Sequence, residues 1–171
     1  MKIQSDLARF GRGFVYALNG IRAAVQEERN FRFHLCAAVY VYAAAFLAGV
    51  DATGYALLAL CVFGVMAMEL MNSAIERAVD KPDTEHWWSA GAAKDMAAGG
   101  VLITAIGALC VGGSLFVNER ALKAIWAGVT ASPLTILLWL ASLVAAYLFT
   151  FRYGNTKEKG AAQNAQNAKQ K

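Results

Sequence analysis

The stretch Val62–Asp80, VFGVMAMELMNSAIERAVD, decides the fold class of this chain and marks its chemistry. It completes the uncharged run Ala52–Met68, which Glu69 follows at once. A carboxylate at the edge of a membrane span costs free energy unless it faces a cavity or a partner. The stretch therefore predicts a transmembrane helix whose end carries functional groups.

Further polar side chains follow Glu69 at helical spacing. Asn72, Glu76 and Asp80 stand at offsets of 3, 7 and 11 from it. At about 100° per residue, the four positions fall within an arc of roughly 80° on one helix face. Three carboxylates on one face repel one another unless cations lie between them, and Mg²⁺ is typically held by one or two carboxylates together with substrate phosphates. We expect Glu69, Asn72 and Glu76 to form a site, while a solvated helix end is the alternative for Asp80.

The composition is typical of a membrane protein. The 171 residues are 58% apolar and 16% charged, with a mean hydropathy of +0.41, whereas soluble domains are about 45–50% apolar and about 25% charged. These values exclude a disordered chain, a secreted disulfide scaffold and a large multidomain enzyme. We predict an all-α fold, an integral membrane helical bundle with an N-terminal amphipathic surface helix and four transmembrane helices. The uncharged runs are Leu35–Val50, Ala52–Met68, Met96–Asn118 and Ala124–Phe151, the last with Pro133 inside it.

The segments that flank these runs set the organisation. Asp6–Glu28 repeats apolar residues at helical spacing and carries several arginines, which is typical of a helix on the membrane surface or packed on a partner subunit. Lys and Arg gather before the first run, between the second and third, and after the fourth, so both termini are predicted to be cytoplasmic. We divide the chain into a core over residues 1–117, an added transmembrane arm over 118–152 and a disordered cytoplasmic tail over 153–171. Met1–Arg12 is polar, and no cleaved signal peptide is expected.

Several motif classes have no match in the sequence. It contains no P-loop, no complete dinucleotide-binding glycine loop, no HRD or DFG of protein kinases, no HExxH and no GxSxG. Cys36, Cys61 and Cys110 each stand alone in an apolar run, which indicates neither a zinc site nor a disulfide framework. The basic residues form no single block, so nucleic acid is not an expected partner.

Three motifs in order resemble those of the small prokaryotic membrane diacylglycerol kinases, a family that includes undecaprenol kinases. Residues 69–80 match the pattern E-x-x-N-[ST]-A-[IL]-E-x-x-V-D at each fixed position. The segment AKDMAAG, residues 93–99, resembles a second motif of that family, and ERNFRFH, residues 28–34, resembles a first. The resemblance covers about residues 5–117 and keeps the spacing between the motifs. It implies an ATP-dependent lipid kinase that works without a soluble kinase fold, as a homotrimer in the bacterial inner membrane.

The resemblance also implies roles for individual residues. Glu69 would be the general base that takes the proton of the lipid hydroxyl, and Glu28 and Glu76 would hold Mg²⁺ with ATP. The nucleotide would contact Arg9, Tyr16, Glu28, Glu76, Glu85, His86, Trp87, Lys94 and Asp95. The lipid would contact Gly13, Arg22, Asn30, Phe31, His34, Glu69, Asn72 and Ala98. On local grounds alone, Lys94 suits either a phosphate or the positive-inside preference.

Some alternatives stay open at this point. The motif details favour undecaprenol over diacylglycerol as the acceptor. A small proton-coupled transporter could also use Glu69, and Asn72, Glu76 and Asp80 would then have no joint role. The fourth uncharged run departs from the three-span family pattern, and we expect it to be structural. Small residues on the third run indicate close helix packing, either within the chain or between subunits: Gly100, Thr104, Ala108 and Gly112.

Overall fold

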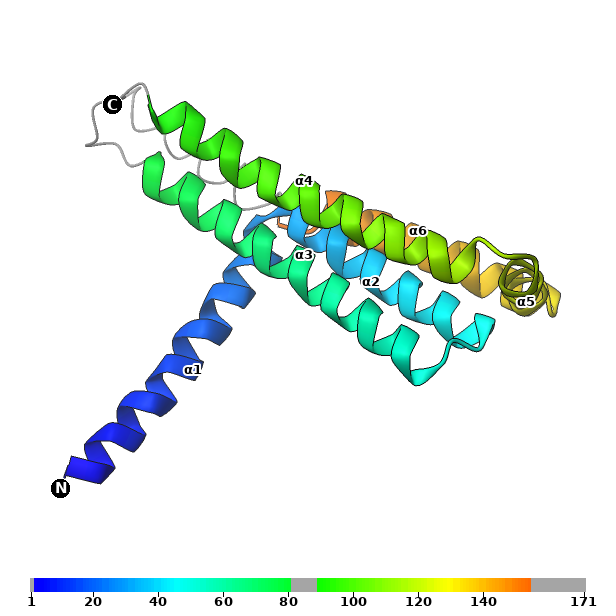
Figure 1. The fold of residues 1–171 in the computed structure, drawn as a ribbon, viewed down its shortest axis with the longest axis horizontal. Coiled ribbons are helices and arrows are strands. Elements are labelled where there is room, and N and C mark those ends of the chain that lie inside the picture. Colours follow the sequence, from blue (N-terminus) through cyan, green and yellow to red (C-terminus); the bar gives the residue numbers. More distant parts are fainter. Residues whose placement is uncertain (1, 81–88, 155–171) are drawn as a thin grey trace, which may run out of the picture.

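The computed structural model describes residues 2–80 and 89–154, and the residues between and beyond these ranges are left out of the description. The described chain is helical and contains no strand, as the sequence predicted. Figure 1 shows the helices as one elongated bundle with a single helix splayed away from it. The helices are α1 (Lys2–Glu27), α2 (Arg29–Ala48), α3 (Ala52–Val79), α4 (Ser89–Phe116), α5 (Glu119–Val129) and α6 (Pro133–Phe151).

Four of these helices, α2, α3, α4 and α6, are long and apolar enough to cross a membrane, which confirms the expected number of spans. Their outward faces carry large apolar side chains, as helices in contact with lipid do. With 28 residues, α3 is about 42 Å long, whereas the hydrocarbon core of a bilayer is about 30 Å thick. Helix α3 is therefore longer than a single crossing of the hydrocarbon core requires.

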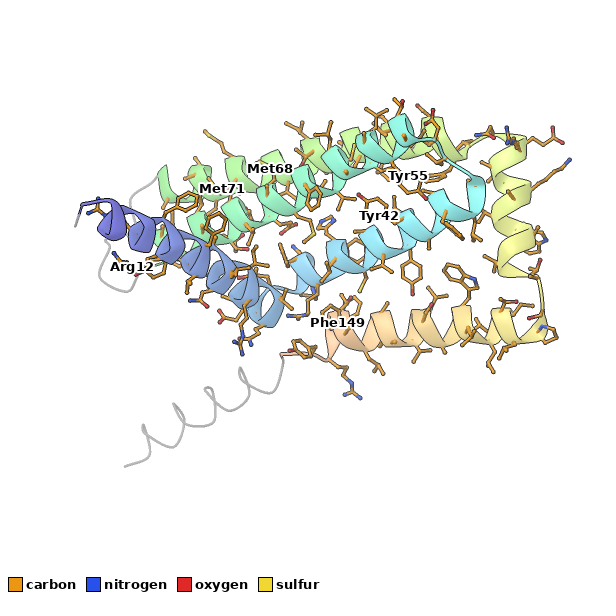
Figure 2. The ribbon with its side chains drawn as sticks, turned by 90° about the horizontal axis from the view of Figure 1, so that it is seen from below. Arg12, Tyr42, Tyr55, Met68, Met71 and Phe149 are labelled. Atoms are coloured by element: carbon orange, nitrogen blue, oxygen red, sulfur yellow. The ribbon has the colours of Figure 1, made fainter. Side chains whose placement is uncertain are left out.

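A tight turn joins α2 to α3. Gly49 adopts the left-handed conformation with φ 65°, and its N–H donates to the carbonyls of Ala45 and Phe46. Asp51 begins α3 by accepting a hydrogen bond of 2.8 Å from the N–H of Gly54. Tyr42 and Tyr55 stack across this hairpin with ring centroids 6.2 Å apart (Figure 2). The turn fixes α2 and α3 as antiparallel neighbours.

Helices α3 and α4 form the most extensive helix pair. Gly100 of α4 lies directly against the end of the Met68 side chain on α3, so a larger residue at position 100 would push that flexible end aside. The Thr104 hydroxyl donates back to the carbonyls of Gly100 and Val101, so its hydrogen bond is satisfied within α4. Gly100 is thus explained by packing within the chain.

The fourth uncharged run is not one helix, and the sequence-based boundary at Ala124 was wrong. The short helix α5 begins at Asn118, whose side chain accepts from the N–H of Ala121, and α5 lies across the end of the bundle (Figure 1). The span α6 starts only at Pro133. Ser132 and Thr135 form a capping box there, and proline is favoured at the first helical position because its missing N–H is not needed. Proline at residue 133 therefore starts a helix instead of interrupting one.

The surface helix α1 leaves the bundle at a steep angle (Figure 1). Glu28 separates it from α2 with an extended conformation, φ −99° and ψ 113°. The apolar side chains of α1, among them Phe10, Phe14 and Leu18, are exposed in the single chain. The predicted amphipathic helix is therefore present, with its apolar face open to a membrane surface or a second subunit.

Candidate active site

The carboxylate stripe of α3 runs from a buried to an exposed environment. Glu69 is only 4% exposed, Asn72 is buried with it, and Glu76 is half-buried. Asp80 ends α3 and is exposed. The predicted sharing of one helix face is therefore realised, and the most deeply placed carboxylate is Glu69.

Glu69 meets a histidine from the neighbouring helix. The Nε2 atom of His34 on α2 lies 3.3 Å from the Oε1 atom of Glu69. Glu69 also interacts electrostatically with Glu28 and Glu76, so the three carboxylates belong to one site. A buried carboxylate needs such a partner, because an unpaired charge at this depth is costly. Sequence reasoning placed His34 on the lipid side and did not find this pairing.

Asn72 stands between Glu69 and Glu76 along the stripe and is hydrogen-bonded to Glu76. Its side-chain N–H donates 2.8 Å to the Oε1 atom of Glu76. Its Oδ1 atom is buried and has no hydrogen-bond partner within the described part of the chain. Buried polar atoms are nearly always satisfied, so an orphaned oxygen between two carboxylates fits an atom that accepts from a substrate or ligates a cation.

The corner between α1 and α2 brings a fourth carboxylate, that of Glu28, to the stripe. Glu28 accepts a 2.7 Å hydrogen bond from Nη2 of Arg77, and Glu27 lies 3.1 Å from the same nitrogen. Arg77 thereby ties the α1–α2 corner to α3 beside Glu76. Sequence reasoning used Arg77 only for orientation, although its place directly after Glu76 was a signal that it could serve the site.

Lys94 of α4 contacts the exposed end of the stripe at Asp80. Its Nζ atom donates to both carboxylate oxygens of Asp80, at 3.0 Å and 2.9 Å, and interacts electrostatically with Glu76. Asp80 is thus paired with Lys94 at the exposed end of α3, where both side chains stay accessible to solvent, and exposed pairs of this kind contribute little free energy. A lysine so placed offers a point charge to an incoming phosphate.

The donor set suits magnesium. Glu28, Glu76 and the orphaned Asn72 Oδ1 are all oxygen donors, the type that Mg²⁺ prefers. Within residues 2–80 and 89–154, no three His, Cys, Asp or Glu side chains are arranged to hold a metal by themselves. Magnesium typically keeps several waters and is shared with substrate phosphates, so two carboxylates are a fitting protein contribution.

An apolar groove of about 560 Å³ lies beside His34, the partner of Glu69. It runs between α2, α3 and α4, and His34 lines its polar end. Met68 and Met71, on either side of Glu69 along α3, are labelled in Figure 2. The groove was not expected from the sequence; Ala108 and Gly112 contribute to it because small residues leave room. Its lining comprises Phe33, His34, Ala37, Ala38, Val41, Leu58, Cys61, Val62, Val65, Ala105, Ala108, Leu109, Gly112, Gly113 and Phe116.

Other residues named from the sequence are not brought to the stripe within one chain. Tyr16, Gly13 and Arg22 are exposed on α1, which points away from the bundle, and Arg9 lies further along the same helix (Figure 1). Asp95 and Ala98 are exposed on α4, Asn30 is exposed on α2, and Phe31 is buried. Glu85, His86 and Trp87 lie outside the described residues, as does the tail from residue 155.

Comparison with known proteins identifies the family of the chain. A family model described as prokaryotic diacylglycerol kinase matches residues 15–116. The chain is 37% identical to an undecaprenol kinase of Bacillus subtilis over 116 residues, which are 68% of this chain and 94% of that protein. It is 44% identical to a diacylglycerol kinase of Synechocystis over 103 residues, 60% of this chain and 59% of that protein. It is 40% identical to a diacylglycerol kinase of Escherichia coli over 91 residues, 53% of this chain and 75% of that protein.

No solved structure matches the chain. The family model covers more than half of it and contains the carboxylate stripe, His34, Arg77 and Lys94. By these matches, the chain belongs to the prokaryotic diacylglycerol kinase family.

Proposed function

We propose that this membrane lipid kinase transfers the γ-phosphoryl group of Mg-ATP to undecaprenol, with diacylglycerol as the second candidate acceptor. One observation carries the proposal: His34, whose Nε2 atom lies 3.3 Å from the buried carboxylate of Glu69, lines an apolar groove of about 560 Å³. A hydrocarbon chain in the groove would place its terminal hydroxyl beside Glu69. The undecaprenol kinase that matches this chain over 94% of its own length supports the choice of acceptor.

Glu69 would act as the general base. Its carboxylate takes the proton of the lipid hydroxyl while the hydroxyl oxygen forms a bond to the γ-phosphorus and the bond from that phosphorus to the β-phosphate oxygen breaks. The hydroxyl has one proton, which goes to Glu69, so Asn72 Oδ1, buried and without a partner among the described residues, would serve the cation as a neutral oxygen ligand. His34, 3.3 Å from Glu69, holds the carboxylate in place. General-base assistance of this kind is worth about 10²–10⁴-fold in rate.

The remaining residues serve charge and position, which are the main demands of phosphoryl transfer. Glu28 and Glu76 would hold magnesium, which would supply positive charge to neutralise the phosphates. Lys94 would move from Asp80 to the nucleotide phosphates, a short step because Asp80 already holds it beside Glu76. Arg77 keeps Glu28 beside the stripe.

We further propose that the site faces the cytoplasm of a bacterial inner membrane and that the enzyme is a homotrimer. Lys and Arg crowd the segments at the site end of the bundle, whereas Arg120 and Lys123 alone lie at its other end. ATP is cytoplasmic, which agrees with this orientation. The exposed apolar face of α1 would lie on the membrane surface beside the site.

Phosphoryl transfer to defined lipids tests the proposal. Purified protein in nanodiscs is given γ-³²P-ATP, Mg²⁺ and either undecaprenol or diacylglycerol, and the lipid products are separated. We expect labelling of lipid that depends on Mg²⁺. The kcat/KM for undecaprenol should be higher than that for diacylglycerol. Faster labelling of diacylglycerol would contradict the acceptor, and labelling of neither would contradict lipid phosphorylation and favour the transporter alternative.

A further inference from the structure

A buried arginine joins the ends of three helices next to the proposed site. Arg32, on the first turn of α2, is only 5% exposed. Its Nη1 atom donates to the carbonyls of Val25, at 3.1 Å, and Gln26, at 3.2 Å, in the last turn of α1. Its Nε and Nη2 atoms donate to the carbonyl of Thr150, at 3.3 Å and 3.2 Å, in the last turn of α6.

The chemistry of helix ends explains this arrangement. The last four carbonyls of a helix have no partner within the helix, and the C-terminal end carries a partial negative charge. Arg32 satisfies such carbonyls on α1 and on α6 with one guanidinium. An arginine this deeply buried requires such partners, and five N–H donors in a rigid fork allow it to serve both helices.

Gly154 brings the chain beyond α6 into the same junction. It has a φ of +88°, a conformation that other residues rarely adopt, and a Cβ placed there would collide with the carbonyl oxygen of Gln26 and lie 3.4 Å from Nη1 of Arg32. Two smaller contacts agree with this docking. The Thr150 hydroxyl donates to the sulfur of Cys36, and the Arg29 guanidinium lies 5.8 Å from the ring centroid of Phe151. Figure 2 shows Phe149, in the last turns of α6, next to the start of α2.

The junction lies within the segment that carries two site residues. Glu28, which Arg77 holds beside the stripe, comes four residues before Arg32, and His34, which contacts Glu69, comes two residues after it. The position of the α1–α2 corner therefore fixes where both side chains meet α3. Helix α6 lies outside the segment that the family model matches, residues 15–116.

We propose that Arg32 is a positioning residue that couples the docking of the added helix α6 to the geometry of the active site. The end of α6, through the Thr150 carbonyl and Gly154, holds Arg32 against the end of α1. This contact fixes the positions of the Glu28 and His34 side chains relative to α3. The added span is then a part of the catalytic apparatus and not only a lipid-facing cover. This inference rests on the proposed function for its kinetic consequences.

Kinetics of junction variants test the coupling. Gly154→Val crowds the junction from the α6 side, Arg32→Gln removes the guanidinium, and Arg32→Lys keeps the charge without the fork. We expect Gly154→Val and Arg32→Gln to lower kcat about tenfold and to raise the Mg²⁺ concentration for half-maximal rate, since small misplacements of catalytic groups are this costly. The KM for lipid should change little, and Arg32→Lys should be intermediate. Ser142→Ala, which breaks the 3.1 Å contact between Tyr40 and α6 away from the junction, should keep wild-type kinetics.

The double variant separates coupling from general damage. Residues that act through one contact are non-additive, so Arg32→Gln with Gly154→Val should be no slower than Arg32→Gln alone. Additive losses would overturn the proposal, and so would wild-type kinetics of Gly154→Val. A lowered melting temperature with an unchanged Mg²⁺ requirement would also overturn it, because it would make the junction merely structural.

Hydrogen exchange gives a readout that does not depend on activity. In Gly154→Val, amides of residues 24–36 should exchange faster than in the wild type, while those of residues 62–72 on α3 should not change. If the wild type phosphorylates no lipid, the proposed function fails and this exchange pattern still decides the coupling. An equal change in exchange rate in residues 24–36 and 62–72 would overturn the proposed coupling. Gly154→Ala, a milder change, supplies the same comparison if Gly154→Val does not fold.

Discussion

The Nε2 atom of His34 lies 3.3 Å from the Oε1 atom of Glu69, and this contact links the first membrane helix to the carboxylate stripe on the next. The side chain of Glu69 is 5% exposed and that of His34 is 21% exposed. A charged group at this depth depends on its hydrogen-bonding partner. The buried carboxylate of Glu69 therefore depends on His34 for its hydrogen bond.

Loss of the histidine should impair catalysis. His34→Leu leaves the buried carboxylate without its partner, at a cost of about 1–3 kcal/mol, so kcat should fall about tenfold or more. His34→Gln keeps an N–H donor and should retain more of the rate. Steady-state kinetics with both variants check this, and an unchanged kcat for His34→Leu would remove the pair from the mechanism.

The metal requirement should depend on two carboxylates. Glu28→Gln and Glu76→Gln each replace a charged ligand by a neutral one, so the Mg²⁺ concentration for half-maximal rate should rise several-fold. Glu27→Gln is the matched control, because Glu27 contacts the same Arg77 nitrogen, 3.1 Å away, but is not a proposed ligand. A titration of rate against Mg²⁺ measures all three. If Glu28→Gln, Glu27→Gln and the wild type gave the same Mg²⁺ titration curve, Glu28 would not be a magnesium ligand.

Nucleotide affinity should depend on the lysine at the mouth of the site. Lys94→Met removes the charge that Asp80 holds there, and a charge-assisted contact to phosphate is worth about 1.5–3 kcal/mol, so the KM for ATP should rise about tenfold or more. Lys123→Met removes a lysine that is paired with Glu119 on α5, far from the stripe, and should leave this KM unchanged. If both variants gave the same KM, Lys94 would serve only membrane orientation.

Packing between α3 and α4 should depend on one glycine. Gly100→Val would displace the methyl group at the flexible end of the Met68 side chain, so the cost of overpacking should lie at the low end of the usual range, about 1 kcal/mol. A Cβ at the adjacent Gly99 would meet nothing within 4 Å, so Gly99→Val is the control. Thermal unfolding in detergent should show a lower midpoint for Gly100→Val alone. Equal midpoints would contradict the close helix contact.

The sequence predicts features that depend on one helix at a time. The spacing of Glu69, Asn72 and Glu76 placed them on one face, because helical geometry alone decides this. The number of spans followed from the length of the apolar runs. The helix boundary at Pro133 was missed, although the Ser132–Pro133 pair is itself a signal for a helix start.

Contacts between helices could not be predicted in the same way. The pairing of His34 with Glu69, of Glu28 with Arg77 and of Arg32 with the Thr150 carbonyl joins residues on different helices. Each pairing depends on how the helices are rotated and shifted against one another, which the pattern along a single helix does not specify. The third of these contacts is made to a backbone oxygen, which has no signature in the sequence.

The most direct test of the central claim is the rate of phosphoryl transfer in Glu69→Gln. In a single turnover with bound Mg-ATP and undecaprenol, the rate should fall about 10²–10⁴-fold, because the amide cannot take the hydroxyl proton. ATP affinity should stay near that of the wild type, and Glu119→Gln, which changes an exposed carboxylate on α5, should keep the full rate. A Glu69→Gln protein that transfers phosphate at the wild-type rate would contradict the account.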